Sequence, residues 1–375
     1  VSPNKINNKR VIYAGTGEYN FSIGIIKSTD DGLTWNTVDA FPFYDYANAT
    51  LPPNYKVQKV IVPQNLSQSQ QDIVYAIARN SFLKSTTGGT TWETPYMLGS
   101  NVGEAVDIEV VSTDYNKLFI STNCITHYQA NPSSNVFDYP AKLFYSTNGG
   151  TSWNDITANI AGNDNYSSIH IEILPNGTLY VHYSIWGGNT YIKKSSDNGL
   201  SWTSILVPAS PSPVALIPKG LYGNESFKVS SQTGIVYQGS TTPFKNNTNM
   251  YGYATTANTH CDIRAIQIIP TSTDDIIIIA NDGGVSKSYD GGTTWNSLNG
   301  VDKKGIMNSE LHGFDISKIH EDRIIVGRQD NGTSLMFKNE WQNQNIFGGD
   351  GEECLFKPND DTYLYSVNNC EIRKG

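Results

Sequence analysis

The chain has 375 residues, of which 38% are hydrophobic and 16% are charged, and it carries a formal net charge of −9. This composition excludes a disordered chain, and an acidic balance without a basic run argues against nucleic acid as a partner. No run of about 20 apolar residues occurs, so the sequence predicts no membrane span.

The predicted elements follow one order along the chain, which is typical of repeated four-stranded sheets. An apolar first strand ends in a turn, a second strand carries an aromatic or aliphatic pair, a short third strand follows, and a fourth begins at a tryptophan. The second-strand pattern occurs eight times, at 11–13, 73–75, 118–119, 179–180, 236–237, 277–278, 324–325 and 364–365. Predicted third strands lie at 25–27, 82–84, 143–145, 191–193 and 285–287.

A segment with the pattern S-x-D-x-G-x-T-W follows the third strand five times and contains five of the seven tryptophans. Its hydroxyl and carboxylate oxygens suit the unpaired N–H groups of a tight turn, glycine suits a positive φ, and tryptophan adds a buried face. The predicted role is structural, although Thr87 and Asn148 replace the aspartate. The predicted turn residues are Ser28, Asp30, Gly32, Trp35, Ser85, Gly89, Trp92, Ser146, Asn148, Gly150, Trp153, Ser195, Asp197, Gly199, Trp202, Ser288, Asp290, Gly292 and Trp295.

This segment resembles the Asp box, or BNR repeat, of sialidases, sortilin-type receptors and xyloglucan-cleaving two-propeller enzymes. The resemblance implies an all-β fold, a β-propeller of about 7–8 four-stranded blades with Asp-box turns. Two blades without the turn are expected around 239–253 and 323–341. We expect residues 1–375 to form a single propeller domain within a larger parent protein. The alternative division is one propeller over 1–347 and the start of a further blade or second propeller over 348–375.

The segment Tyr13–Glu18 resembles the opening blade of large secreted Asp-box proteins of Bacteroidetes-type bacteria, and 281–288, 329–332 and 348–351 resemble their later blades. Such proteins often carry a sorting domain for type IX secretion. The resemblance therefore implies a secreted or cell-surface protein.

Aromatic side chains concentrate in the connections after second strands and in the links between blades. In a propeller these connections share one face, where ligands usually bind. Aromatic rings stack on sugars and anchor protein partners, but they also pack loops onto a propeller. The candidate ligand-binding residues are Phe43, Tyr44, Tyr46, His127, Tyr128 and Trp186.

Four acidic residues belong to the same predicted face and are weak catalytic candidates: Glu18, Asp282, Asp330 and Asp350. Two carboxylates about 6.5–9.5 Å apart suit an inverting glycosidase. Asp282-Gly-Gly284 partly resembles the Asp-x-Gly-Gly setting of the xyloglucan-cleaving enzymes, although Asp-Gly is also ordinary turn chemistry. The Phe-Arg-Ile-Pro element of sialidases is absent, which disfavours a sialidase.

No cofactor or metal site is predicted, because the histidines lack metal-ligand spacing and the Asp-rich turns, although compatible with Ca²⁺, lack an EF-hand pattern. Cys354 and Cys370 lie in successive predicted strands, as a bridge or as two buried thiols.

Three functions remain open. The first is a non-catalytic module that binds glycan or protein, without nucleic acid or a membrane span and with further domains of the parent chain as partners. The others are an inverting endo-glycoside hydrolase and a structural spacer in a large adhesin.

Overall fold

The computed structural model describes most of the chain, and every structural statement below concerns this part. The described residues are 1–17, 22–38, 56–64, 72–124, 139–161, 166–185, 190–205, 226–239, 243–247, 250–252, 263–281, 284–298, 311–320, 322–328, 332–338, 340–341, 349, 351–357, 364–368 and 371–374.

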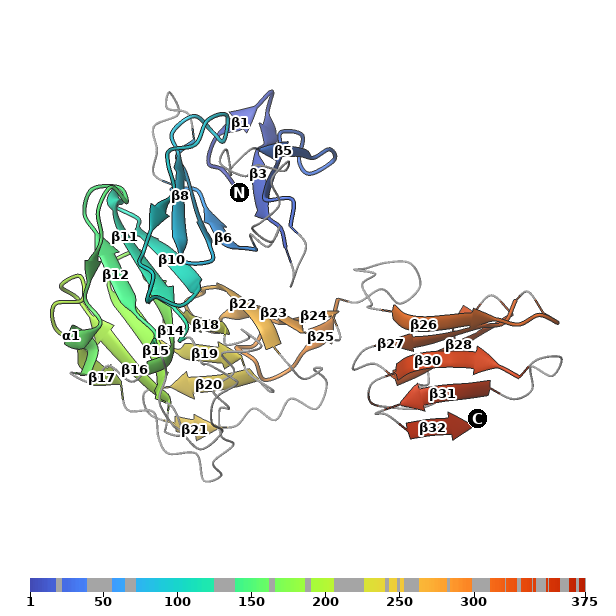
Figure 1. Ribbon diagram of the computed structural model, residues 1–375. Helices are drawn as coiled ribbons and strands as arrows, with labels where there is room; N and C mark the ends of the chain where they lie inside the picture. The colour runs from blue at the N-terminus through green and yellow to red at the C-terminus, as the bar shows by residue number, and fades with distance from the viewer. Residues whose placement is uncertain are drawn as a thin grey trace. The chain divides into compact units, whose positions relative to one another are not determined.

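The described chain is built from consecutive antiparallel sheets in which hydrogen-bonded neighbours follow sequence order (Figure 1). It separates into two compact units, 1–223 and 224–375, and each is described by itself. The up-and-down order within each sheet is that of a propeller blade.

The first unit contains a short hairpin, four successive sheets and one helix. The hairpin is β1 (Lys5–Ile6) and β2 (Lys9–Arg10), and the first sheet is β3 (Ile12–Gly15), β4 (Ile25–Ser28) and β5 (Asn36–Val38). The second sheet is β6 (Val57–Ile61), β7 (Val74–Ala78), β8 (Ser81–Ser85) and β9 (Tyr96–Met97). The third is β10 (Ala105–Val111), β11 (Asp114–Thr122), β12 (Leu143–Ser146) and β13 (Asn154–Asp155), followed by α1 (Ala158–Ala161). The fourth is β14 (Tyr166–Ile173), β15 (Leu179–Ile185), β16 (Thr190–Ser195) and β17 (Thr203–Ile205).

The second unit continues the series with four more sheets. The fifth is β18 (Ser226–Val229), β19 (Val236–Gly239), β20 (Pro243–Asn247) and β21 (Met250–Gly252). The sixth is β22 (Ile263–Ile269), β23 (Ile276–Asn281), β24 (Gly284–Ser288) and β25 (Asn296–Ser297). The seventh is β26 (Leu311–Ile316), β27 (Ile324–Arg328), β28 (Gly332–Phe337) and β29 (Glu340–Trp341). The eighth is β30 (Gly351–Phe356), β31 (Leu364–Asn368) and β32 (Glu371–Lys374).

The predicted all-β, blade-type fold is confirmed. All eight second-strand patterns fall in strands, and β18–β21 and β26–β29 are the two expected sheets without the S-x-D-x-G-x-T-W turn. One detail was wrong, because the fourth strands begin after the tryptophan and not at it. β5 begins at Asn36, directly after Trp35, since the indole closes the turn instead of joining the ladder. The number of blades that close a ring and the domain division stay predictions.

Alternation along the second strand explains why successive sheets of the first unit stack face to face. On β7, Val74 and Ala76 pack with apolar residues of the first sheet, whereas Tyr75 and Ile77 pack with those of the third. All four side chains are buried, so β7 is apolar on both faces. A sheet covered on both sides is what a series of stacked blades requires.

Polar contacts near the start of the second strands tie neighbouring sheets together. The hydroxyl of Tyr13 on β3 donates to the buried carboxylate of Asp72, which precedes β7, at 2.9 Å. In the second unit, Tyr237 on β19 donates to the buried Asp275 before β23, also at 2.9 Å. Tyr75 on β7 instead donates to the backbone carbonyl of Tyr115, at 3.2 Å. Each contact joins one sheet to the next in chain order, so it fixes how the two faces meet.

Candidate functional site

None of the predicted ligand-binding or catalytic residues lies in the described part of the chain. Their placement therefore rests on the strands that flank them. The residues outside the described ranges are Glu18, Phe43, Tyr44, Tyr46, His127, Tyr128, Trp186, Asp282, Asp330 and Asp350. Cys370 also lies outside them, so its pairing with the buried Cys354 stays open.

The described strands show where several of these residues join the sheets. β15 ends at Ile185, directly before Trp186, and β23 ends at Asn281, directly before Asp282. Because strands alternate in direction, the end of a second strand lies at the same sheet edge as the start of the first. This edge, opposite the S-x-D-x-G-x-T-W turns, is called the connection edge below.

The connection that contains Glu18 is anchored at its base. The Ser22 hydroxyl donates to the Thr16 carbonyl at 2.8 Å, and the Thr16 hydroxyl donates to the Gly24 carbonyl at 2.8 Å. The Thr16 carbonyl also accepts the N–H of Val57 at 3.1 Å, which links this base to β6 of the next sheet. Gly17 has a φ of 122°, and a Cβ there would meet Ser22 at 2.8 Å and Lys56 at 2.9 Å. Only glycine fits this crowded position without strain.

The connection that contains His127 and Tyr128 has a similar base at the end of β11. Thr122 exchanges hydrogen bonds with Lys142, and Asn123 donates its N–H to the Glu104 carbonyl at 2.9 Å. Asn123 also bridges to Ser168 on β14 of the following sheet. A Cβ on Gly103 would lie 1.9 Å from the Asn123 carbonyl oxygen, so this close backbone approach requires glycine.

The sheets around the Asp330 and Asp350 connections also approach backbone to backbone. The Gly332 N–H donates to the Gly349 carbonyl at 2.7 Å. A Cβ on Gly327 would lie 1.9 Å from the Glu352 carbonyl oxygen. The two connections therefore start from adjoining positions on β28 and β30.

Three charged side chains on the first strands of the first unit form an ion cluster. Lys59 Nζ on β6 lies 2.7 Å from Asp107 Oδ1 and 2.7 Å from Glu109 Oε1, both on β10. Burial by itself lowers the pKa of Lys59, but the two carboxylates outweigh it and raise that pKa above its ordinary value. Asp107 also accepts the N–H of Ile171 on β14 at 3.3 Å. The cluster thereby spans three first strands and satisfies an N–H that an edge strand leaves unpaired.

The S-x-D-x-G-x-T-W turns hold themselves together by local hydrogen bonds. In the first turn, Ser28 Oγ accepts the Gly32 N–H at 2.9 Å, and Asp30 Oδ1 accepts the Thr34 N–H at 2.8 Å. The Trp35 indole donates to the Gly32 carbonyl at 3.0 Å. Hydrogen bonds from the Thr34 hydroxyl and N–H and from the Ser28 hydroxyl lower the pKa of Asp30 to about 2. An exposed carboxylate that is occupied in this way serves the turn and not a bound substrate.

The fourth and fifth turns repeat this arrangement. Asp197 accepts the Ser201 N–H at 2.9 Å, Asp290 accepts the Thr294 N–H at 2.8 Å, and the pKa of each aspartate falls to about 2 through bonds to the same threonine or serine. Trp202 and Trp295 donate to the carbonyls of Gly199 and Gly292.

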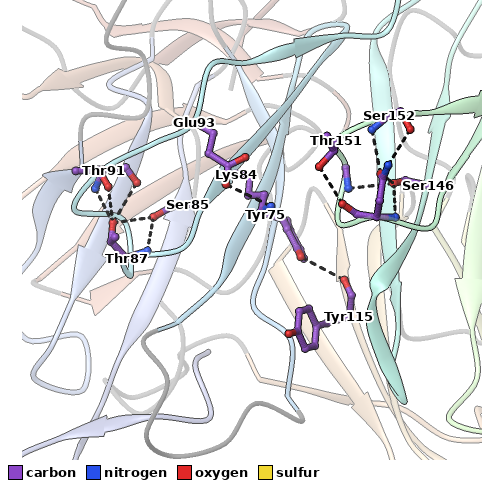
Figure 2. Close-up of polar contacts among 12 residues, drawn as sticks. Tyr75, Lys84, Ser85, Thr87, Thr91, Glu93, Tyr115, Ser146, Thr151 and Ser152 are labelled. Atoms are coloured by element: carbon purple, nitrogen blue, oxygen red, sulfur yellow. Dashed lines mark hydrogen bonds and ion pairs between the residues drawn. The ribbon is translucent and has the colours of Figure 1, made fainter.

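The two turns without aspartate are held differently (Figure 2). Thr87 Oγ1 accepts the Thr91 N–H at 2.8 Å, and Asn148 Oδ1 accepts the Ser152 N–H at 3.0 Å. The Asn148 amide also donates to the Ser152 hydroxyl at 2.9 Å, where the aspartates accept. Within the described residues, the buried Nε1 of Trp92 has no hydrogen-bond partner.

Sequence reasoning missed a second positive-φ residue in each turn. The residue before the glycine is also left-handed, with φ between 58° and 66°. This explains the Asp-Gly, Asn-Gly and Gly-Gly pairs at this point, because Asp, Asn and Gly tolerate that conformation best. These residues are Asp31, Gly88, Gly149, Asn198 and Gly291.

The inter-sheet aspartates were missed as well. Asp72 and Asp275 each lie three residues before the aromatic or aliphatic position of the second strand, represented by Tyr75 and Ile278. That spacing was the available signal, but an isolated Asp before a strand looks like ordinary turn chemistry.

Searches for other kinds of site gave no candidate in the described ranges. They hold no group of three or more His, Cys, Asp or Glu side chains placed to bind a metal ion. They also hold no helix with the length and apolar character needed to cross a membrane.

Comparison with known proteins gives distant likenesses. No protein-family model matches the chain. It is 26% identical over 211 residues to a xyloglucanase of a Paenibacillus species, a match that covers 53% of this chain and 20% of the relative. It is 24% identical over 217 residues to xyloglucanase Xgh74A of Acetivibrio thermocellus, covering 53% of this chain and 24% of the relative. The match thus spans between a fifth and a quarter of the length of these curated relatives.

Solved propellers show weak structural likeness. YCF48 from Cyanidioschyzon merolae is 17% identical with a TM-score of 0.45, over 84% of this chain and 88% of that one. The GH74 xyloglucanase from Xanthomonas campestris is 13% identical with a TM-score of 0.38, over 97% of this chain and 62% of that one. Likenesses of this size carry no argument about function, and the fold assignment rests on the strands themselves.

Proposed function

We propose that this chain is a glycan-recognition module of a secreted or cell-surface protein and that it binds xyloglucan or a related polysaccharide at the connection edge. The observation that supports the ligand class is the sequence likeness to two xyloglucanases over 53% of the chain. The connection edge is the proposed surface because the aromatic connections join the sheets there.

The anchored bases of these connections favour recognition by a preformed surface. Thr16, Thr122 and Gly332 each bond at a base, and each base reaches the following sheet through a backbone contact. A loop that is fixed at its ends loses less conformational entropy when it binds a ligand.

Binding is tested by affinity electrophoresis and calorimetry with xyloglucan, using mannan as the control polysaccharide. Trp186→Ala is expected to weaken xyloglucan binding at least about tenfold, the loss of a binding hot spot of roughly 1.4 kcal/mol. Tyr289→Ala is the matched control, because Tyr289 is an exposed aromatic residue in the fifth turn, at the opposite sheet edge. Equal loss in both variants, or no xyloglucan binding by the unaltered protein, would contradict the proposal.

An inverting endo-glycoside hydrolase is the second candidate, favoured because both curated relatives are named xyloglucanases. In this case Asp282, Asp330, Asp350 or Glu18 would supply the acid and base. Release of new reducing ends from xyloglucan, lost in Asp282→Asn while binding persists, would establish this candidate. Absence of both binding and hydrolysis would leave the structural spacer.

A further inference from the structure

Large apolar side chains are exposed on one face of the seventh sheet. On β26, Phe314 is 66% exposed and Ile316 is 46% exposed. They alternate with Asp315, which lies on the other face and accepts the N–H of Phe356 on β30 at 2.8 Å. β26 therefore contacts the eighth sheet on one side and leaves an apolar surface on the other. This surface, Phe314 with Ile316, is called the β26 face.

Strand register identifies the equivalents of the β26 face in the other sheets. Phe314 pairs with Val326, the residue after the aromatic or aliphatic position of the second strand. The residues with the same pairing are Ile108 on β10, Ile171 on β14, Ile266 on β22 and Cys354 on β30. All four are buried. Phe314, the largest of the set, is thus the one that lacks the usual cover.

In each of those sheets the cover comes from the preceding sheet. Ile108 packs with Tyr75 and Ile77 of the second sheet. Ile171 packs with Phe119 of the third sheet, Ile266 with Tyr237 of the fifth, and Cys354 with Ile325 of the seventh. The rule holds in both units, so the sixth sheet is the expected cover of the β26 face.

The sixth sheet offers a matching surface at the required positions. Ile278 on β23 takes the position of Tyr75, and Val285 on β24 takes that of Phe82. Tyr75 and Phe82 are buried against the third sheet, whereas Ile278 and Val285 are only partly buried and Ile269 on β22 is 47% exposed. Two partly uncovered apolar faces therefore occur on sheets that are consecutive in the chain.

We propose that the β26 face docks on the Ile278 and Val285 face of the sixth sheet, so that the stacked series continues through the second unit. The two faces together hide apolar area that water otherwise contacts, which is the main force that drives such packing. Docking places the end of β23 beside the end of β27 at the connection edge. The inference is independent of the glycan proposal, since it concerns packing and not a ligand.

Chemical cross-linking tests this docking directly. The variant Ile278→Cys/Phe314→Cys is treated with a short bis-maleimide, and linked peptides are identified by mass spectrometry, which separates them from the native cysteines. An intrachain link between positions 278 and 314 is expected. Tyr75→Cys/Ile108→Cys is the positive control, because this equivalent pair packs in the first unit. Ile278→Cys/Leu355→Cys is the negative control, because Leu355 is exposed on another sheet.

Each outcome decides the proposal. A link between two chains would assign the β26 face to a second copy and overturn it. Absence of the link in a protein whose circular dichroism is unchanged, while the positive control links, would also overturn it. Hydrogen exchange supplies a second readout: Phe314→Asp should speed exchange in β23 several-fold, whereas Leu33→Asp, at a residue 76% exposed in the first turn, should not. Equal exchange rates in both variants would count against docking.

Discussion

Removal of the Tyr13 hydroxyl tests how the first two sheets are joined. Tyr13 donates to the Asp72 carboxylate at 2.9 Å, and both side chains are buried. Because the acceptor is charged, Tyr13→Phe is expected to lower the free energy of unfolding by about 1.5–3 kcal/mol. Tyr75→Phe is the matched control, since Tyr75 donates to the neutral carbonyl of Tyr115 at 3.2 Å. Its expected loss is about 0.5–1.5 kcal/mol.

Urea unfolding, monitored by tryptophan fluorescence, measures both variants within the same unit. A second background isolates the charge: in Asp72→Asn the acceptor remains but is neutral, so Tyr13→Phe should then cost only about 0.5–1.5 kcal/mol. The reasoning is refuted if Tyr13→Phe costs no more than Tyr75→Phe, or if its cost is the same in both backgrounds.

Four further outcomes follow from the turns and the close contacts. Thr87→Asp should stabilise the second turn by about 0.5–1 kcal/mol, because a carboxylate accepts both an N–H and a hydroxyl; an unchanged urea midpoint would contradict this. Lys59→Met should destabilise by about 1–3 kcal/mol, less than a fully buried pair, and adding Asp107→Asn should recover part of the loss; additive losses would exclude the ion cluster as the cause. The pKa of Asp290 is lowered from 3.8 to about 2, so its stabilising contribution is full above the unfolded value and disappears as pH falls through 2. Carboxyl titration by NMR checks this, and a midpoint near the ordinary value would reject it. Gly103→Ala should cost about 1–3 kcal/mol in urea unfolding because its Cβ would lie 1.9 Å from a carbonyl oxygen, and a neutral result would show that the backbone yields there.

The connection edge could be predicted only in outline. The strand that precedes Trp186 was identified from its apolar pattern, and β15 does end at Ile185. The contacts that anchor the bases could not be found, because they join residues far apart in sequence, such as Asn123 and Ser168. A pattern read along one strand carries no information about which carbonyl a neighbouring sheet presents.

The sequence by itself determined the strands and turns, because these depend on local chemistry. The period of two in segments such as 73–77 and the spacing of Ser28, Asp30, Gly32 and Trp35 act within a few residues. Tertiary structure alone decided that Asp72 receives the hydroxyl of Tyr13 and that Lys59 meets Asp107 and Glu109. Those contacts are set by the stacking of one sheet on the next. Stacking depends on the shape and burial of whole faces, which no local pattern specifies.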